Sequence, residues 1–352
     1  MVENSFHKKF QLNSISFSSV DELLNYTKGF SEEIHQFLDS WFSKSDLIIV
    51  KTSGSTGKPK PISLKKEFVI NSAKATGNYF KLQESTSALL CLPIEYIAGK
   101  LMLIRALTLG WKLDVIDANS NPLEKVEKQY DFSAMVPLQL ENSLTKIHLI
   151  KKLIVGGGVV SNALQEKLQT VSTDVFATYG MTETITHIAV KKLNHFESLL
   201  GKITKKYFYQ TLPNVIIYKD DRNCLVINAP KVAEEIIFTN DVIQLISDKQ
   251  FEWLGRFDNV INSGGIKLHP EKIEEKLAKI ITNRSCVIGI PDEKMGEKLV
   301  LIVEGKKQDV NFENTDLSKF EIPKEIYFVD SFIETDSGKI HRKKTLEKIF
   351  TK

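Results

Sequence analysis

The sequence of 352 residues has few cysteines, and the three that it has, Cys91, Cys224 and Cys286, lie far apart. No C-x-x-C spacing occurs among them, which argues against both a disulfide framework and a zinc site. The seven histidines form no H-x-x-x-H or similar pair. No transition metal held by protein ligands is therefore indicated.

The sequence also lacks long apolar runs and a strong excess of charge. Its N-terminus, MVENSFHKKFQLN, has no apolar segment of a signal peptide, and no run approaches the length that crosses a bilayer. The net charge of +3, from 47 basic and 44 acidic residues, is too small to indicate a nucleic-acid-binding protein. We expect a cytoplasmic enzyme for anionic small molecules, although a mixed solvated surface explains the charge equally well.

Short apolar runs alternate with helical patterns between Leu47 and Thr178. After Leu47–Val50, which resembles a buried strand, the expected strands are Ser87–Leu92, Lys112–Ile116, Phe132–Val136, Lys152–Val155 and Asp174–Ala177. The expected helices are Lys65–Phe80, Ala98–Leu109, Leu123–Lys128 and Asn162–Val171, the last with Ser161 as N-cap. This alternation predicts an α/β fold with a mainly parallel sheet flanked by helices.

The pattern changes after about Ile188, where short β-rich runs are separated by turn clusters such as Lys219–Asn223. These runs are Tyr207–Gln210, Val215–Tyr218, Leu225–Asn228, Glu235–Phe238 and Val242–Ser247. They predict a small β subdomain, built as antiparallel hairpins or as a small barrel. The last block combines a helix, Pro270–Ile281, with strands at Cys286–Ile290, Lys298–Val303 and Glu325–Val329 and a basic C-terminal helix, which indicates a small α+β domain.

The segment Thr52–Lys60, TSGSTGKPK, is the most informative part of the chain. Its glycines let backbone N–H groups approach an anion, while its hydroxyls and lysines add donors and charge. It does not match G-x-x-x-x-G-K-[ST], because Gly54 and Gly57 are too close and Pro59 stands where a metal-binding hydroxyl is needed. We therefore expect a phosphate-binding loop of another kind; a flexible surface loop is the alternative.

Two more segments follow expected strands. Tyr179–Glu183, YGMTE, comes after the strand that ends at Ala177, at the sheet edge where ligands bind. Tyr179 could stack on a base, Thr182 could donate to a phosphate, and Glu183 could hold Mg²⁺; a turn with a surface glutamate is the alternative. Gly156–Gly158 leave room for a flat ligand, or simply allow tight strand–helix packing.

Two segments near the C-terminus complete the set. Gly255–Pro270 joins an arginine and an aspartate to a glycine turn, which is typical of a hinge or of an interdomain linker with a hairpin. Lys339 follows a glycine ahead of the last helix, and by itself it is an ordinary solvated lysine.

Together, in this order and spacing, the segments from Thr52 to Lys339 resemble the acyl-adenylate-forming superfamily of acyl- and aryl-CoA ligases, peptide-synthetase adenylation domains and luciferases. The resemblance implies a domain of residues 1–254, a hinge at 255–258 and a mobile domain of residues 259–352 that meets the first over the active site. It implies that Thr52, Ser53, Gly54, Ser55, Thr56, Gly57 and Lys60 hold the ATP phosphates, with Gly157, Gly158 and Gly180 beside the nucleotide.

Further roles follow from the same resemblance. Tyr179 matches the residue that contacts adenine, Thr182 the α-phosphate contact and Glu183 the Mg²⁺ ligand. Asp241 and Arg256 match the two ribose-binding residues. Asp258 matches the hinge, Gly264 and Gly265 the turn that lines the thiol tunnel, and Lys339 the lysine used in adenylation. Asn240 stands where glycine is usual, Lys272 where glutamate is usual, and Tyr96 where histidine is usual.

The short chain and the segment Tyr96–Arg105 resemble the 2-succinylbenzoate–CoA ligases of menaquinone biosynthesis. This implies ATP, Mg²⁺ and coenzyme A, with Tyr96, Gly99 and Lys100 near the acid. That acid keeps a second carboxylate, for which Arg105 is the candidate cation, unless it is a helix-surface arginine. The alternatives are another acid, with coenzyme A or a carrier protein as acceptor, and a nucleotide-binding protein without turnover. The sequence leaves a homodimer open.

Overall fold

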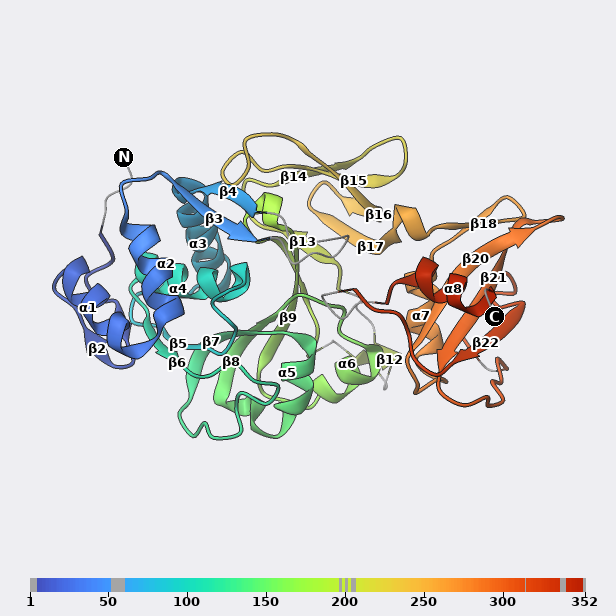
Figure 1. The fold of residues 1–352 in the computed structure, drawn as a ribbon, viewed down its shortest axis with the longest axis horizontal. Helices are drawn as coiled ribbons and strands as arrows, with labels where there is room; N and C mark the ends of the chain where they lie inside the picture. Colours follow the sequence, from blue (N-terminus) through green and yellow to red (C-terminus); the bar gives the residue numbers. More distant parts are fainter. Residues whose placement is uncertain are drawn as a thin grey trace.

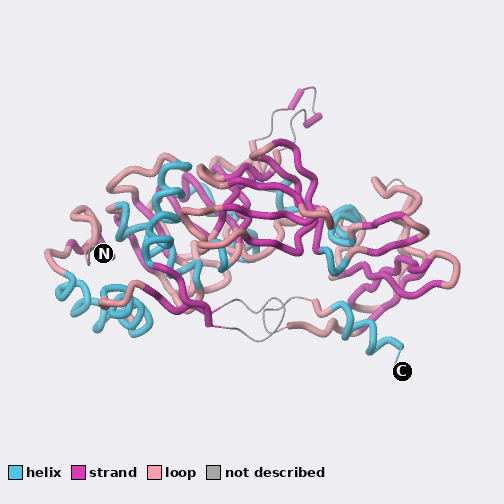
Figure 2. Tube along the Cα trace, turned by 90° about the horizontal axis from the view of Figure 1, so that it is seen from above, coloured by secondary structure: helices cyan, strands magenta, loops and turns pink. Residues whose placement is uncertain are grey.

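The computed structural model describes residues 5–51, 61–195, 198–199, 202–203, 207–313, 315–335 and 340–350. Most strands up to residue 256 belong to one large sheet, and the strands from residue 261 onward form a separate smaller one (Figure 1). Seen from above, the two regions lie at opposite ends of an elongated molecule (Figure 2).

Five parallel strands form the part of the large sheet that the alternating sequence pattern predicted. They are β5 (Ser87–Leu90), β6 (Lys112–Val115), β7 (Tyr130–Met135), β8 (Ile150–Val155) and β9 (Asp174–Gly180). Their order is β9-β8-β7-β5-β6, and β1 (Gln11–Leu12) and β2 (Ile15–Ser16) extend the sheet beyond β6. The carboxyl ends of β8 and β9 are therefore neighbours, at the edge where open α/β sheets bind ligands.

Alternate side chains of these strands enter two different apolar layers. Leu90 and Ile154 belong to one layer, and Leu89 and Leu153 belong to the other, as expected when successive residues point to opposite faces. The first layer includes α1 (Val20–Phe30), α2 (Glu32–Phe42), α3 (Lys66–Phe80) and α4 (Ile97–Leu109). The second includes α5 (Pro137–Asn142), η1 (Leu144–Leu149) and α6 (Asn162–Leu168). The predicted helix-flanked sheet is confirmed.

Beyond β9 the same sheet becomes antiparallel. Its further strands are β10 (His187–Lys192), β13 (Tyr209–Thr211), β17 (Gln250–Arg256), β16 (Ile237–Ser247), β15 (Cys224–Asn228) and the edge strand β14 (Ile216–Lys219). The predicted hairpins are confirmed, but the small-barrel alternative is wrong because these strands continue the large sheet. A separate two-stranded pair is formed by β11 (Ser198–Leu199) and β12 (Lys202–Ile203).

The smaller sheet has the order β19-β18-β21-β20, with β22 parallel to β21. Its strands are β18 (Ile261–Ser263), β19 (Ile266–Leu268), β20 (Ser285–Asp292), β21 (Gly296–Glu304) and β22 (Glu325–Val329), accompanied by α7 (Pro270–Leu277) and α8 (Arg342–Phe350). The predicted glycine turn joins β18 to β19, and both of its residues need a left-handed backbone, with φ of 59° at Gly264 and 80° at Gly265.

Three predictions of single elements need correction. Leu123–Lys128 is not a helix: its backbone turns, and Lys146 Nζ donates to the carbonyl oxygens of Glu124 and Val126 at 2.7 and 3.1 Å. The two strands expected at 235–238 and 242–247 are one strand, β16, which is irregular between Val242 and Ile243 instead of turning there.

The strand at Leu47–Val50 is also only partly as predicted. It is β3 (Leu47–Lys51), and it pairs with β4 (Pro61–Lys65) alone, outside the large sheet. Ile48 and Val50 are buried, whereas Ile49 is 68% exposed. The run is therefore a strand with one buried face, not a strand buried on both sides.

Candidate functional site

Side chains from three strands, β9, β16 and β17, meet at the carboxylate of Asp241. The hydroxyl of Tyr179, at the end of β9, donates to Asp241 Oδ2 at 2.6 Å, and Trp253 Nε1, on β17, donates to Oδ1 at 3.1 Å. Arg256 Nη1 lies 3.6 Å from Oδ1, because Arg256 is the register partner of Asp241 across β16 and β17. Burial, with Asp241 nearby, raises the pKa of Tyr179 well above its usual value, so the phenol remains a donor.

Thr182 and Glu183 follow directly in a short 3₁₀ turn, η2 (Thr182–Thr184), where Glu183 is exposed. The turn ends in a strained backbone: Ile185 has φ 66° and ψ −57°, and Thr186 N donates to Thr184 O at 2.7 Å. This is a γ-turn of the rare positive-φ type. A β-branched residue in this conformation is a genuine outlier of the kind that occurs at functional sites.

Glycines bring the backbones of β8, β9 and β10 close together beside this turn. At Gly180 an added Cβ would lie 2.1 Å from Thr186 O and 2.5 Å from His187 Cα, so no side chain fits there. At Gly156 it would lie 2.7 Å from Thr178 Oγ1. Gly157 adopts φ 80°, which glycine tolerates. Gly158 follows on the same loop, so the glycines and the Tyr179 segment share one edge of the sheet.

The predicted hinge residue Asp258 is linked to this cluster. It lies in η3 (Phe257–Asn259), 3.8 Å from Arg256 Nη2, and its Oδ2 accepts from Asn240 Nδ2 at 3.3 Å. Asn240 in turn accepts from Arg222 Nη1 at 2.9 Å. Asn240 therefore connects the predicted hinge residue to the turn between β14 and β15.

Arg105 is buried in the interior and is not on a helix surface. It is 2% exposed on α4, and burial lowers the pKa of its guanidinium to about 10. Its Nε is buried without a hydrogen-bond partner, and no ion pair joins Arg105 to any other residue that the structure describes. Burial, and then the charge of Arg105, lower the pKa of the neighbouring His187 to about 3, so that histidine is neutral. The helix-surface alternative is excluded.

The other residues predicted near the acid have structural contacts. Lys100 Nζ donates to Ile94 O at 2.8 Å and to Glu95 O at 2.7 Å, which holds the loop ahead of α4. A Cβ at Gly99 would lie 2.3 Å from Pro93 O, so glycine is required there. Tyr96 is 55% exposed. These three residues shape the start of α4.

Several predicted residues lie outside the described residues, and one pair lies elsewhere in the fold. The phosphate-loop residues Thr52, Ser53, Gly54, Ser55, Thr56, Gly57 and Lys60 are outside the described ranges, as is Lys339. Gly264 is placed beside the β20–β21 turn, where its N–H donates to Met295 O at 2.8 Å. Gly264 and Gly265 are thus in the C-terminal region, at a distance from the glycines of β8.

The described side chains fit a magnesium ion that is held by one protein carboxylate and otherwise by phosphates and water. Within the described ranges no three histidine, cysteine or carboxylate side chains are grouped so that they could hold a metal. Glu183 is an accessible carboxylate on the rim of the site. Mg²⁺ often takes one or two protein carboxylates together with phosphates and water. Glu183 meets that requirement.

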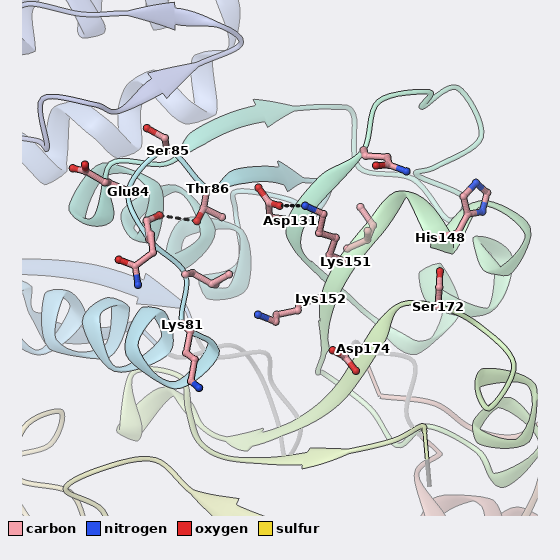
Figure 3. Close-up of a pocket in the computed structure, with 14 residues that line it drawn as sticks. Lys81, Glu84, Ser85, Thr86, Asp131, His148, Lys151, Lys152, Ser172 and Asp174 are labelled. Atoms are coloured by element: carbon pink, nitrogen blue, oxygen red, sulfur yellow. Dashed lines mark hydrogen bonds and ion pairs between the residues drawn. The ribbon is translucent and has the colours of Figure 1, made fainter. Parts of the chain in front are cut away.

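A cavity of about 720 Å³ lies at the opposite edge of the sheet. Its lining includes residues where β7, β8 and β9 begin, and charged groups that already have partners, such as Lys151 with Asp131 at 2.7 Å (Figure 3). It contains none of the predicted site residues. Because ligands of open α/β sheets bind at the carboxyl ends of the strands, we do not place the site there.

Pattern analysis missed three contributors to the site: Trp253, His187 and Asn240 as a linker. Trp253 had a usable signal, because it lies only three residues before Arg256, although no strand was expected at 250–256. His187 had none, since its burial beside Arg105 depends on how α4 packs on the sheet.

Comparison with known proteins finds a matching family model and similar sequences. A family model described as AMP-binding enzyme matches residues 7–223, more than half of the chain. The 2-succinylbenzoate–CoA ligase of Lactococcus lactis is 24% identical over 319 residues, covering 84% of this chain and 70% of that protein. The enzyme of the same name from Listeria monocytogenes is 26% identical over 344 residues, covering 89% and 72%.

Solved structures are similar as well. An acyl-CoA synthetase (AMP-forming)/AMP-acid ligase II-like protein from Dyadobacter fermentans is 34% identical with a TM-score of 0.59, covering 90% of this chain and 93% of that one. The O-succinylbenzoate coenzyme A synthetase of Bacillus subtilis, in complex with ATP and magnesium ion, has a TM-score of 0.71 at 20% identity, covering 93% and 82%. The second likeness supports the fold alone. Separately, no helix in the described ranges is long and apolar enough to cross a membrane.

Proposed function

This chain belongs to the AMP-binding enzyme family, and from that premise we propose that it is an AMP-forming acid–CoA ligase whose acid is 2-succinylbenzoate. In the first step the acid's carboxylate attacks the α-phosphorus of ATP, which forms an acyl-adenylate and releases pyrophosphate. In the second step the thiol of coenzyme A attacks the acyl carbon and AMP leaves. The curated relatives with that name motivate the choice of acid.

The observation that carries the proposal is the convergence of Tyr179, Trp253 and Arg256 on Asp241. We assign Asp241 and Arg256 to the ribose hydroxyls and Tyr179 to the adenine. A carboxylate that is already held by a phenol and an indole is fixed in place, so binding a ribose requires little further ordering. Thr182 and Glu183 follow Tyr179 closely enough to reach the phosphates of the same nucleotide.

Lys339, Thr182 and Glu183 are the proposed catalytic residues. Lys339 would neutralise charge that builds on the α-phosphate in the transition state, which is where a fixed cation is most effective. Glu183 would hold Mg²⁺, which supplies further positive charge to the phosphates when bound. We also propose the boundaries 1–254, 255–258 and 259–352, so that rotation at Asp258 withdraws Lys339 and presents Gly264 and Gly265 for the thiol step.

The burial of Arg105 supports an acid with a second carboxylate. A buried guanidinium without an anionic partner is costly, and an anionic ligand would compensate it. We therefore assign Arg105 to that carboxylate, with Tyr96, Gly99 and Lys100 shaping the entrance through the start of α4.

The decisive test is a panel of carboxylic acids in a pyrophosphate-release assay with ATP and Mg²⁺, with coenzyme A present or absent. We expect release with 2-succinylbenzoate, and thioester only when coenzyme A is added. Release only with a different acid would identify that acid as the substrate. Transfer only to a carrier protein would identify the carrier protein, not coenzyme A, as the acceptor. No release with any acid would leave a nucleotide-binding protein without turnover.

The division of labour has its own test. Lys339→Ala should slow adenylate formation by about 100-fold or more, because the charge it supplies is needed in that transition state. Thioester formation from supplied acyl-adenylate should be nearly unchanged. Equal loss in both steps would remove Lys339 from its proposed role.

A further inference from the structure

An ion pair joins the two regions across the proposed hinge. Lys272, on α7, donates to Glu252 Oε1, on β17, at 2.9 Å. The pair is partly buried, with 25% of the Lys272 side chain and 15% of the Glu252 side chain exposed. Glu252 precedes residues 255–258 and Lys272 follows them, so the pair can form only while α7 lies against β17.

A second contact holds the same helix from another side. Asn162 Nδ2, at the start of α6, donates to the carbonyl oxygen of Glu275 at 3.1 Å. The carboxylate of Glu275 lies 3.2 Å from Lys272 Nζ. The two carboxylates outweigh burial and raise the pKa of Lys272, so the ammonium is charged. Two elements of the large sheet's region, β17 and α6, thus form polar contacts with α7.

In this orientation the glycine turn faces away from the large sheet. Gly264 N donates to Met295 O, and Ser263 pairs with Gly296, which places the turn beside the β20–β21 hairpin. Figure 1 shows that hairpin reaching away from the N-terminal region, whereas α7 lies on the side that faces it. The contacts of α7 therefore belong to an arrangement in which Gly264 and Gly265 do not reach the site.

We propose that Glu252 and Lys272 form an interdomain latch that stabilises this arrangement and must open before the glycine turn can approach the site. Both residues are positioning residues, since they act through the placement of the C-terminal region. The inference deepens the proposed function and rests on it for its effect on the two half-reactions.

The charge of residue 272 determines whether this contact is attractive or repulsive. A glutamate at this position would lie beside Glu252 and Glu275, and like charges repel. Lysine turns that repulsion into attraction. Because both side chains keep some contact with water, separating them costs less than separating a fully buried pair. The latch can therefore open during turnover.

The orientation can be measured without any substrate. Spin labels at Lys74→Cys on α3 and Lys348→Cys on α8 report the distance between the two regions; both positions are exposed, and the three native cysteines are buried. In the otherwise unaltered protein we expect one dominant distance. Lys272→Met and Glu252→Gln should each shift the population toward other distances by about threefold to tenfold. The double variant should add little to either single change, because both remove one interaction.

A matched control comes from the same helix. Lys276 lies about one turn beyond Lys272 but pairs with Glu321 of its own region at 2.7 Å. Lys276→Met removes the same charge without touching the large sheet's region, so it should leave the distance distribution unchanged. Lys272→Arg, which keeps a cation, should restore the dominant distance.

The half-reactions provide the functional readout. Lys272→Met should lower the rate of adenylate formation relative to thioester formation from supplied adenylate, by about the same factor as the population shift. An unchanged distance distribution in Lys272→Met, or the same shift in Lys276→Met, overturns the latch. Failure of every acid to release pyrophosphate would instead overturn the ligase assignment, while the distance measurement would still decide the latch.

Discussion

The environment of Arg105 shows how burial makes a single charge informative. A guanidinium that is 2% exposed, with an unpaired Nε, contributes little to the stability of the fold and can even reduce it. We therefore expect an anionic ligand to compensate the charge of Arg105. The sequence could show only that an arginine lies on a helix; its burial depends on the packing of α3 and α4.

Replacing Arg105 should therefore have different effects on stability and on activity. Arg105→Met should leave the thermal midpoint unchanged or higher, because it replaces an unpaired buried charge with an apolar side chain of similar length. It should lower kcat/KM for 2-succinylbenzoate by about tenfold or more, and the KM for ATP much less. Calorimetry and steady-state kinetics check both parts. A lower midpoint with an unchanged kcat/KM would make Arg105 a structural residue.

His187 makes a prediction about pH. Its pKa falls from 6.5 to about 3 on folding, through burial and the charge of Arg105. Between these values the unfolded chain binds a proton that the folded chain does not, so stability must fall as pH drops below about 6.5, by up to about 1.4 kcal/mol per pH unit.

The measurement is urea unfolding between pH 7.5 and 5. His187→Gln removes this titrating group, so its free energy of unfolding should fall less steeply with acid than that of the unaltered protein. Parallel curves for the two proteins would show that another group carries the dependence.

At the scale of elements, the parallel strands were predictable because both of their faces are apolar. Such strands are recognised in a sequence as short apolar runs separated by turn residues. The helix expected at 123–128 does not form, because Lys146 satisfies the carbonyl oxygens of Glu124 and Val126 in another way. Whether β16 is one strand or two depends on an irregular register with β17, which is a tertiary property.

The same holds for the site. The Tyr179 and Asp241 segments could be recognised separately, but the meeting of Tyr179, Trp253 and Arg256 on one carboxylate depends on the register of β16 with β17. The close approach of β9 and β10 at Gly180 is a further consequence of pairing that no local pattern reveals.

Gly180 therefore yields a prediction at this scale. Gly180→Ala should destabilise the protein by about 1–3 kcal/mol, because its Cβ would overlap backbone atoms of β10 that cannot move independently. Activity should fall as well, since Tyr179 and Thr182 flank the displaced residue. Gly29→Ala, in α1, is the control: nothing lies within 4 Å of its Cβ, and alanine there should stabilise the helix by about 0.5–1 kcal/mol. Equal effects of both changes on urea unfolding would contradict the argument.

At the scale of the whole molecule, the described residues form separate apolar clusters on either side of residues 254–260. The two clusters of the large sheet contain no residue beyond Trp253, and the two clusters of the C-terminal region begin at Ile261. Between the regions lie polar contacts such as Glu252 with Lys272. Contacts of this kind can break and re-form in water at modest cost, as a rotation between two half-reactions requires.

Such a division predicts two unfolding transitions. Leu301, fully buried in the C-terminal region, and Leu90, 1% exposed in the large sheet, belong to different clusters. Each Leu→Ala change should cost about 2–5 kcal/mol, yet Leu301→Ala should lower only the transition of the C-terminal region and Leu90→Ala only the other. Differential scanning calorimetry would resolve the two transitions. A single transition that moved equally in both variants would show that the two regions unfold as one cooperative unit. That result would contradict the separation of the apolar clusters and, with it, an easy rotation about Asp258.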